Sequence, residues 1–405
     1  MTPPVEPDTQ RIPVRYWIWL LGAAVSLLGD YTMTFAVGWS ASQYGGRVAG
    51  LVLLLMVAPR AVLLLIGGAI GDRFGAPRVL LASCVAMFVL TAALVPASLE
   101  FGEPVWLLIV TSFGLGVIEA FFLPSYRAMP RLLVPTSVVP RALASLQVLG
   151  VLFAVCGTAI GGLVVGWAGL KAASGLNAIT FLIMIATLLV IRGTTQQHGA
   201  TGTKIMRSIG DGLKVAFGNP LTRTLLIVML IAYGLLQPMD GLILPLLARD
   251  HGWSASTAAL LLSCRALGVG LIALRIMAKG AFPRPGLVAP FGLIIAGLGL
   301  FGLSELEALP LAIGSAMVSG IGVGLFTGHL LPLLMNSVEK EYQSRLQSVV
   351  VLCQSSAVVI MNPLLGTFAD LNAIGITGVC LGVGIASALL GVIALNRPTF
   401  RNATV

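Results

Sequence analysis

Five ionisable residues lie inside long apolar stretches of the sequence. Three are the acids Asp30, Glu119 and Asp240, and two are the bases Arg60 and Arg265. A charge inside a membrane-spanning helix is costly and usually serves a function. Each base can neutralise one acid, so one carboxylate is left without a partner. A desolvated carboxylate without a counter-charge holds a proton more readily, which is the chemistry that coupling to a proton gradient requires.

Depth along the apolar stretches indicates which of these charges can meet. Asp30 lies about 20 Å and Arg60 about 15 Å from the same side of the apolar region, at about 1.5 Å per residue, so they can pair. Asp240 and Arg265 also lie at compatible depths. Glu119 can be the proton-binding acid, or it can pair with Arg60 or with Arg127. The sequence leaves these alternatives open.

Polar residues recur at helical spacing beside two of the acids. One set has the spacing i, i+4, i+8 and the other i, i+4, i+7, so each lies on one helix face. The sets are Ser26, Asp30 and Thr34, and Tyr233, Gln237 and Asp240. The pattern predicts that both acids face a polar cavity. The alternative is that the acids are salt-bridged struts between helices.

His329 and Gln354 are two further polar residues in apolar stretches. His329 can act as a proton-binding or substrate-binding group, because histidine titrates near neutral pH, or it can be a hydrogen-bonded structural residue. Gln354 can contact a polar substrate or tie helices together.

The five cysteines lack the spacing of a zinc site. We therefore predict no metal and no cofactor, with a proton gradient as the energy source.

The composition excludes several classes of protein. Of 405 residues, 57% are hydrophobic and only 10% are charged, and the mean hydropathy is +1.00. An ordinary soluble domain carries about 25% charged residues. So little charge rules out a water-soluble enzyme, a nucleic-acid-binding domain and a disordered protein. The sequence also lacks the G-x-x-x-x-G-K-S/T string that cradles nucleotide phosphates, which argues against ATP as the energy source.

Twelve stretches are apolar and long enough to cross a membrane as helices, which takes about 20 residues each. They are 17–43, 48–70, 79–99, 105–128, 141–166, 172–192, 223–247, 254–276, 286–303, 309–332, 345–367 and 374–395. The predicted fold is therefore an all-α polytopic membrane protein with 12 transmembrane helices.

The longest polar connection divides these stretches into two sets of six. We predict an N-terminal tail (1–16), a first six-helix bundle (17–192), a central loop (193–222), a second six-helix bundle (223–395) and a C-terminal tail (396–405). Within the central loop, apolar residues recur at helical spacing over 204–217. This pattern favours an amphipathic helix on the membrane surface, with a solvated linker helix as the alternative.

The distribution of basic residues predicts the orientation in the membrane. With the N-terminus in the cytoplasm, 19 of the 24 lysines and arginines lie in inner segments, and only Arg47, Lys171 and Arg249 lie in outer loops. This asymmetry is the positive-inside signature. It places both termini in the cytoplasm and explains the net charge of +9 without a nucleic-acid partner. The excess of arginine over lysine is typical of a GC-rich bacterium, so we expect the bacterial inner (cytoplasmic) membrane.

The loop between the second and third stretches carries Gly68, Asp72, Arg73, Gly75 and Arg78. Glycine permits a tight turn, an aspartate can accept hydrogen bonds at a helix N-terminus, and arginines can pair with acids. The spacing resembles the G-x-x-x-D-R-x-G-x-x-R/K loop of the major facilitator superfamily. The resemblance implies a latch between conformations. The alternative is that the basic residues only set the topology.

Other segments resemble one branch of that family. Residues 121–145 are similar to the fourth and fifth helices of macrolide and multidrug efflux proteins. Residues 157–162 are similar to the glycine-rich antiporter motif, although Thr158 stands where proline is common. The corresponding loop of the second half is degenerate, with Leu274 in place of the acid.

The resemblance implies two pseudo-symmetric six-helix bundles that rock about a central site. It implies a transporter, not an enzyme, acting mostly as a monomer in a lipid bilayer. The expected partners are protons and an amphipathic or cationic small molecule that is exported by alternating access. One alternative is a dedicated carrier of a single metabolite, such as a siderophore or a lysolipid. A remote alternative is an intramembrane enzyme, although no D-x-x-x-D or H-E-x-x-H string is present.

Overall fold

The computed structural model of the chain describes residues 12–191, 218–305, 308–339 and 342–401. The elements of the first half are α1 (Val14–Ser42), α2 (Gly46–Phe74), α3 (Ala76–Phe101), α4 (Val105–Leu133), the 3-10 turn η1 (Thr136–Val138) and α5 (Val139–Ile191). Those of the second half are α7 (Pro220–Leu236), the π-helical turn η2 (Met239–Ile243), α8 (Leu244–Asp250), α9 (Ala255–Lys279), α10 (Pro285–Glu305), α11 (Leu309–Asn336), α12 (Gln343–Ala369), α13 (Gly375–Leu395) and α14 (Pro398–Arg401).

Eleven helical stretches of the described chain are long and apolar enough to cross a membrane. One of them contains α5, whose 53 residues hold two crossings, because the backbone leaves the helical region at Ala168 and Gly169. Gly169 has a φ of 70°, a conformation that glycine adopts without steric cost. Glu103 then accepts a hydrogen bond from the Leu170 amide at 2.8 Å, which satisfies the first turn of the new helix. The described chain thus makes the expected twelve crossings.

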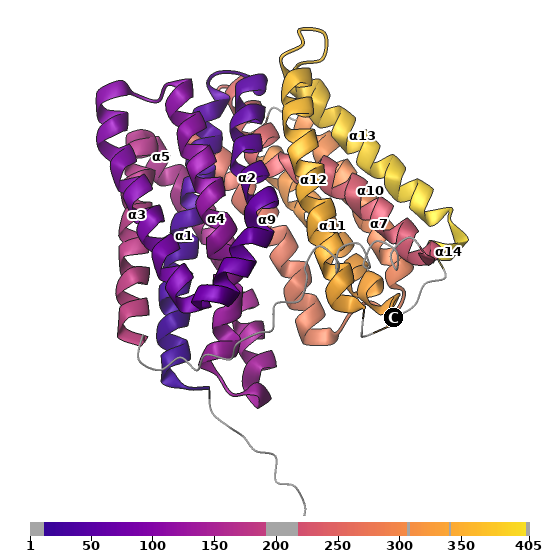
Figure 1. Ribbon diagram of the computed structural model, residues 1–405. Helices are drawn as coiled ribbons and strands as arrows, with labels where there is room; N and C mark the ends of the chain where they lie inside the picture. The colour runs from indigo at the N-terminus through magenta and orange to yellow at the C-terminus, as the bar shows by residue number, and fades with distance from the viewer. Residues whose placement is uncertain (1–11, 192–217, 306–307, 340–341, 402–405) are drawn as a thin grey trace, which may run out of the picture.

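The crossings form two bundles. Figure 1 shows α1–α5 on one side and α7–α13 on the other. In the first bundle α1 packs against α5 and α2 against α4, and in the second α10 packs against α11 and α13. The described chain begins and ends at the lower end of Figure 1. We call this the terminal end, and the opposite end the far end.

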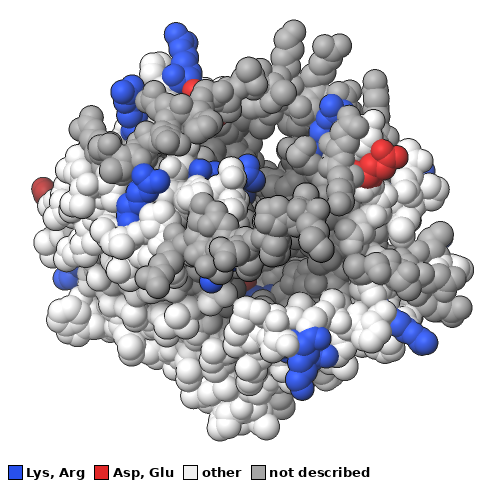
Figure 2. Space-filling view, turned by 90° about the horizontal axis from the view of Figure 1, so that it is seen from below, with Lys and Arg blue, Asp and Glu red and all other residues white. Residues whose placement is uncertain are grey.

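The bundles contact each other through α2 with α12 and α5 with α9. Small residues allow these helices to approach closely. Gly50 lies against the backbone of Pro363, and Gly162 lies against Ala259. Among the described residues, the hydrogen bonds between the two bundles lie in the half of the molecule nearer the far end. One of them runs from the Ser256 hydroxyl to the Gly162 carbonyl at 3.2 Å. The structure is therefore closed at the far end. Figure 2 looks onto the terminal end, where lysine and arginine side chains lie around the rim.

Several helix ends differ from the expected ones. α1 begins at Val14 and α2 continues to Phe74. α7 begins at Pro220, inside the range expected for the central loop, because Asn219 caps it by accepting from the Leu221 amide at 2.9 Å. The short α14 lies within the expected C-terminal tail. The predicted amphipathic helix at 204–217 lies outside the described residues.

Candidate functional site

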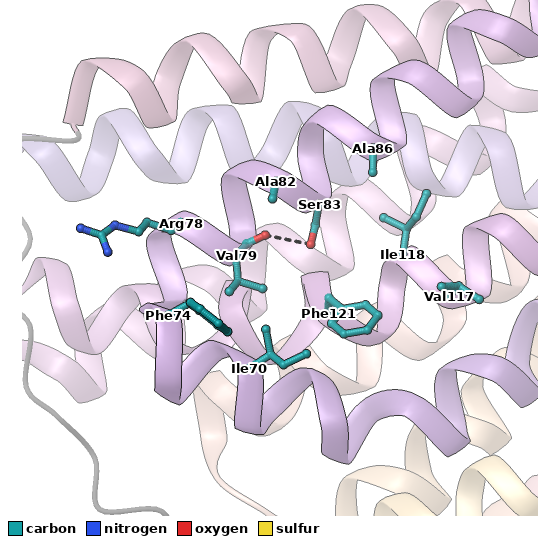
Figure 3. Close-up of a pocket in the computed structure, with 10 residues that line it drawn as sticks. All are labelled: Ile70, Phe74, Arg78, Val79, Ala82, Ser83, Ala86, Val117, Ile118 and Phe121. Atoms are coloured by element: carbon teal, nitrogen blue, oxygen red, sulfur yellow. Dashed lines mark hydrogen bonds between the residues drawn. The ribbon is translucent and has the colours of Figure 1, made fainter.

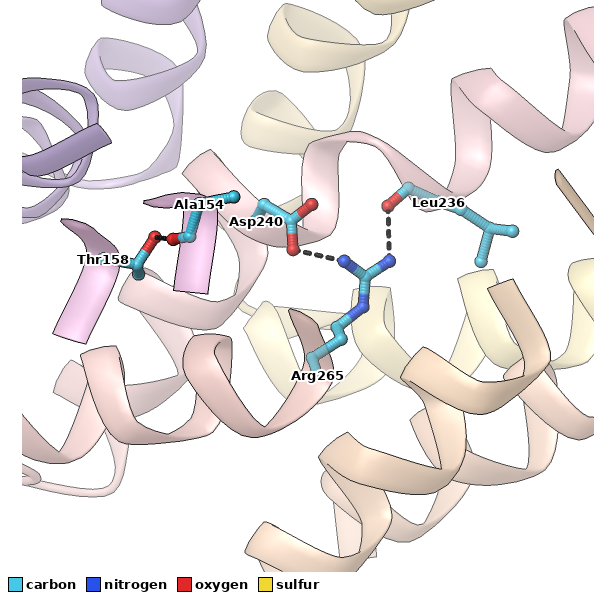
Figure 4. Close-up of polar contacts among 5 residues, drawn as sticks. All are labelled: Ala154, Thr158, Leu236, Asp240 and Arg265. Atoms are coloured by element: carbon cyan, nitrogen blue, oxygen red, sulfur yellow. Dashed lines mark hydrogen bonds and ion pairs between the residues drawn. The ribbon is translucent and has the colours of Figure 1, made fainter. Parts of the chain in front are cut away.

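The acid of the seventh crossing is held at a break in its helix. Pro238 separates α7 from η2, and a proline has no N–H for the helical ladder. The Asp240 amide bonds the Gln237 carbonyl, which leaves the Leu236 carbonyl available to another donor. Arg265 of α9 donates to that carbonyl at 3.1 Å and also to the Asp240 carboxylate. Figure 4 shows the guanidinium between these two acceptors.

The Asp240–Arg265 ion pair is unequally exposed. The Arg265 side chain is 5% exposed and the Asp240 side chain 44%. The base is therefore fixed inside the bundle, and the acid presents part of its carboxylate to the space outside. Across that space in Figure 4 lies Thr158 of α5, whose hydroxyl bonds the Ala154 carbonyl at 2.8 Å. This pairing is the one that the depth argument predicts.

Arg60 of α2 forms the second ion pair, with Glu119 of α4 at 2.7 Å. The side chains are 35% and 19% exposed. α2 and α4 pack closely here, with Gly116 of α4 against the backbone of Leu55. The sequence leaves Asp30 and Glu119 open as partners of Arg60. The structure pairs Arg60 with Glu119 and not with Asp30.

Asp30 is the carboxylate that remains. It lies half-buried on α1 and makes no hydrogen bond or ion pair with any other residue of the described ranges. Glu119 lies within electrostatic range of Asp30. Tyr31 lies within electrostatic range of Asp30, Glu119 and Asp240. Acids from α1, α4 and η2 thus act electrostatically on the same tyrosine.

The other predicted cavity residues are placed unevenly. Ser26 is fully buried, and its hydroxyl bonds the Ala23 carbonyl at 2.9 Å, so it does not continue the polar stripe into open space. Thr34 and Tyr233 are half-buried, and so is Gln354 of α12. Gln237, the remaining residue of the two polar stripes, is exposed at the end of α7.

His329 lies on α11, where both ring nitrogens have partners. Nδ1 lies 2.8 Å from the Leu325 carbonyl, and Nε2 accepts from the Phe282 amide at 3.1 Å. The side chain is buried, with 1% of the residue exposed. These contacts tie the connection between α9 and α10 to α11, which favours the structural alternative for His329.

The predicted latch loop joins α2 to α3 at the terminal end. Gly75 has a φ of 89° and connects the two helices directly. Asp72, Arg73 and Arg78 are exposed, and the Arg73 guanidinium lies over the Phe74 ring at 5.3 Å. The glycine therefore makes the turn, while the charged groups point to the surface.

Beside this loop lies an apolar cavity of about 500 Å³ between α2, α3 and α4. Figure 3 shows Phe74, Val79 and Phe121 at its walls. The Ser83 hydroxyl at this cavity bonds the Val79 carbonyl at 2.9 Å, so the lining offers carbon surface almost throughout. The central acids are not part of this lining.

Sequence reasoning missed the role of the Leu236 carbonyl as an acceptor for Arg265. The signal was Pro238 in the middle of an apolar stretch, since a proline there interrupts the helical hydrogen bonds. Within the described ranges no group of three or more His, Cys, Asp or Glu side chains is placed to hold a metal ion.

The amino-acid sequence matches the family description "Major Facilitator Superfamily" over residues 19–362. The chain belongs to this superfamily. It is therefore a multi-pass membrane transporter and not an enzyme. The match covers most of both bundles, including the latch loop and all five intramembrane charges.

Two curated relatives match nearly the whole chain. The multidrug efflux pump Tap of Mycolicibacterium fortuitum is 24% identical, over 97% of this chain and 98% of the relative. Macrolide efflux protein A of Streptococcus pyogenes is 22% identical, over 88% of this chain and 89% of the relative.

Solved structures share the fold at lower sequence identity. A POT family transporter in complex with a thioalcohol-conjugated peptide has a TM-score of 0.75 at 13% identity and covers 95% of this chain and 96% of its own. The nucleoside transporter NupG has a TM-score of 0.72 at 12% identity, with 94% and 98% covered. Both confirm the arrangement of two six-helix bundles.

Proposed function

We propose that the protein exports amphipathic or cationic small molecules through the bacterial cytoplasmic membrane in exchange for protons. The names of the relatives, a multidrug efflux pump and a macrolide efflux protein, support export of such compounds. The positive-inside distribution supports placing the terminal end, with both termini, in the cytoplasm. The structure, closed at the far end, would then receive substrate from the cytoplasmic side.

The observation that carries the proposal is the unequal number of acids and bases among the charged residues inside the two bundles. Three carboxylates face two guanidinium groups, and the two ion pairs account for Glu119 and Asp240. Asp30 is left to bind either a proton or the cationic group of a substrate. One carboxylate cannot hold both at once, so binding of one favours release of the other. This competition is the minimal requirement for exchange.

Two tyrosines of the polar stripes, one next to Asp30 and one on the stripe of Asp240, also fit an amphipathic substrate. Tyr31 and Tyr233 are half-buried and present an aromatic face with a polar tip. An aromatic face attracts an organic cation. The exposed part of the Asp240 carboxylate provides a hydrogen-bond acceptor for polar groups of the substrate, since Arg265 reaches it from the buried side.

The test is efflux of ethidium in inverted membrane vesicles energised by respiration, with and without a proton ionophore. We expect ionophore-sensitive transport by the natural protein and its loss in Asp30→Asn, with wild-type amounts of protein in the membrane. Asp250→Asn is the matched control, because Asp250 is an exposed acid at the far end with no partner among the described residues. Wild-type transport by Asp30→Asn, or efflux that survives the ionophore, would contradict the proposal.

A further inference from the structure

The N-terminus of α2 is capped by a side chain of the other bundle. Asp370, at the end of α12, accepts from the Gly46 amide at 2.6 Å and from the Arg47 amide at 2.8 Å. The first amides of a helix have no partner within the helix, and the helix dipole favours a negative charge there. A carboxylate that accepts two such amides is a strong, charge-assisted cap.

The C-terminus of α1 is held in the complementary way. Arg249, near the end of α8, donates to the Ser42 hydroxyl at 2.6 Å and to the Trp39 carbonyl at 2.9 Å. Its guanidinium also lies over the Trp39 ring at 4.2 Å. The last carbonyls of a helix lack partners and favour a cation. Charge and hydrogen bonding therefore act together at this helix end as well.

The two sets of contacts lie on either side of the short turn that joins α1 to α2. Gly45 in this turn has a φ of 87°, and a Cβ there would lie 3.0 Å from Asp370 Oδ1. Seven residues earlier, on α1, a Cβ at Gly38 would lie 2.8 Å from the Gly241 carbonyl of η2. Glycines at these places let the second bundle close directly on the backbone of the first.

We propose that Asp370 and Arg249 form a clasp that holds the far end closed, and that transport requires its release. Each side chain belongs to the second bundle, and each of its partners belongs to the first. When the bundles separate at the far end, both contacts break and the helix ends are returned to water. The clasp therefore stabilises the closed far end relative to the open one. It depends only on alternating access, not on the identity of the substrate or on proton coupling.

The clasp also shares a structural element with the central site. Asp240 lies on η2 and Arg249 on α8, which follows η2 without a break. Nine residues of helix span about 14 Å at 1.5 Å per residue. If the Asp240–Arg265 ion pair breaks, η2 can shift. Because α8 continues η2, such a shift would also move Arg249. This connection gives a route from an occupied site to release of the far end.

The test measures distances between spin labels in a variant without native cysteines. Labels at Lys171 and Asn372 report the far end, and labels at Arg131 and Lys279 report the terminal end. All four residues are exposed. Pulsed electron resonance in nanodiscs gives the populations of the open and closed distances. The measurement requires neither substrate nor proton gradient, so its outcome is separate from that of ethidium efflux.

We expect Asp370→Asn and Arg249→Gln each to raise the ratio of far-end-open to far-end-closed molecules about tenfold, the effect of losing one charge-assisted contact. Asp250→Asn and Glu100→Gln are matched controls, because these exposed side chains near the far end make no hydrogen bond or ion pair with another described residue. Unchanged distances in both clasp variants would overturn the proposal, and so would an equal shift in the controls. A reciprocal shift of the terminal-end distances towards the closed value establishes that each variant is folded and still alternates.

Discussion

Removal of Asp240 should destabilise the protein more than removal of Arg265, and removal of both should restore part of the loss. The reason is the unequal burial of the pair, since the Arg265 side chain is 5% exposed and the Asp240 side chain 44%. Asp240→Ala leaves a buried guanidinium with the Leu236 carbonyl as its acceptor. Arg265→Met instead leaves a carboxylate that water can reach.

The magnitudes follow from this asymmetry. Breaking a buried ion pair by removing one partner costs about 3–5 kcal/mol. The exposed side of Asp240 places Asp240→Ala at the lower limit, about 3 kcal/mol. Arg265→Met fills the buried site with an unbranched apolar chain and leaves the Leu236 carbonyl unpaired, which costs about 1 kcal/mol. The double variant lacks the buried charge, so its cost should also be about 1 kcal/mol.

The assay is reversible urea unfolding of the four proteins in the same detergent, followed by tryptophan fluorescence. The double variant should be about 2 kcal/mol more stable than Asp240→Ala alone. The Arg60–Glu119 pair is the internal comparison, because both its side chains are partly exposed, and Glu119→Ala should cost only about 1 kcal/mol. A double variant as unstable as the sum of the two single losses would refute the argument from burial.

Three further predictions concern the ends of the helices and the topology. Gly75→Ala should cost about 1–2 kcal/mol in thermal unfolding, because its φ of 89° is unfavourable for a residue with a Cβ. His329→Leu should cost about 1–2 kcal/mol in the same measurement, because the Phe282 amide loses its acceptor; an unchanged melting temperature would exclude this structural role. A cysteine at Trp167, which is 85% exposed, should react with an impermeant thiol reagent in intact cells, whereas one at Lys279 should react only after permeabilisation. The reverse pattern would invert the proposed orientation.

The sequence predicts the twelve crossings because hydropathy is a local property of a chain in lipid. It also predicts that one acid is left without a basic partner, since this follows from the count of three acids and two bases in the apolar stretches. What it cannot predict is which acid remains unpaired. Arg60 is at a compatible depth with both Asp30 and Glu119, and the close packing of α2 on α4 at Gly116 decides between them.

The contacts at the far end could not be predicted for the same physical reason. Asp370 is 324 residues from Gly46 in sequence, and neither position has a local pattern that points to the other. Arg249 counts only as one of three basic residues in outer loops until α8 is placed beside α1. Pairings between the two halves depend on how the bundles meet, and the same helices meet differently in each conformation.

The latch loop and the clasp should act in opposite directions on one equilibrium. Asp72 is exposed at the terminal end and makes no hydrogen bond or ion pair with another residue of the described ranges. A latch that holds the terminal end closed must therefore make its contacts in the other conformation.

Asp72→Asn should then favour the present, far-end-closed conformation, whereas Asp370→Asn should favour the opposite one. Because the two positions lie at opposite ends of the molecule and share no partner, their effects should add within about 0.5 kcal/mol. The double variant should return towards the natural distribution of spin-label distances. If Asp72→Asn leaves both distances unchanged in conditions where the natural protein samples both conformations, the loop between α2 and α3 sets topology only.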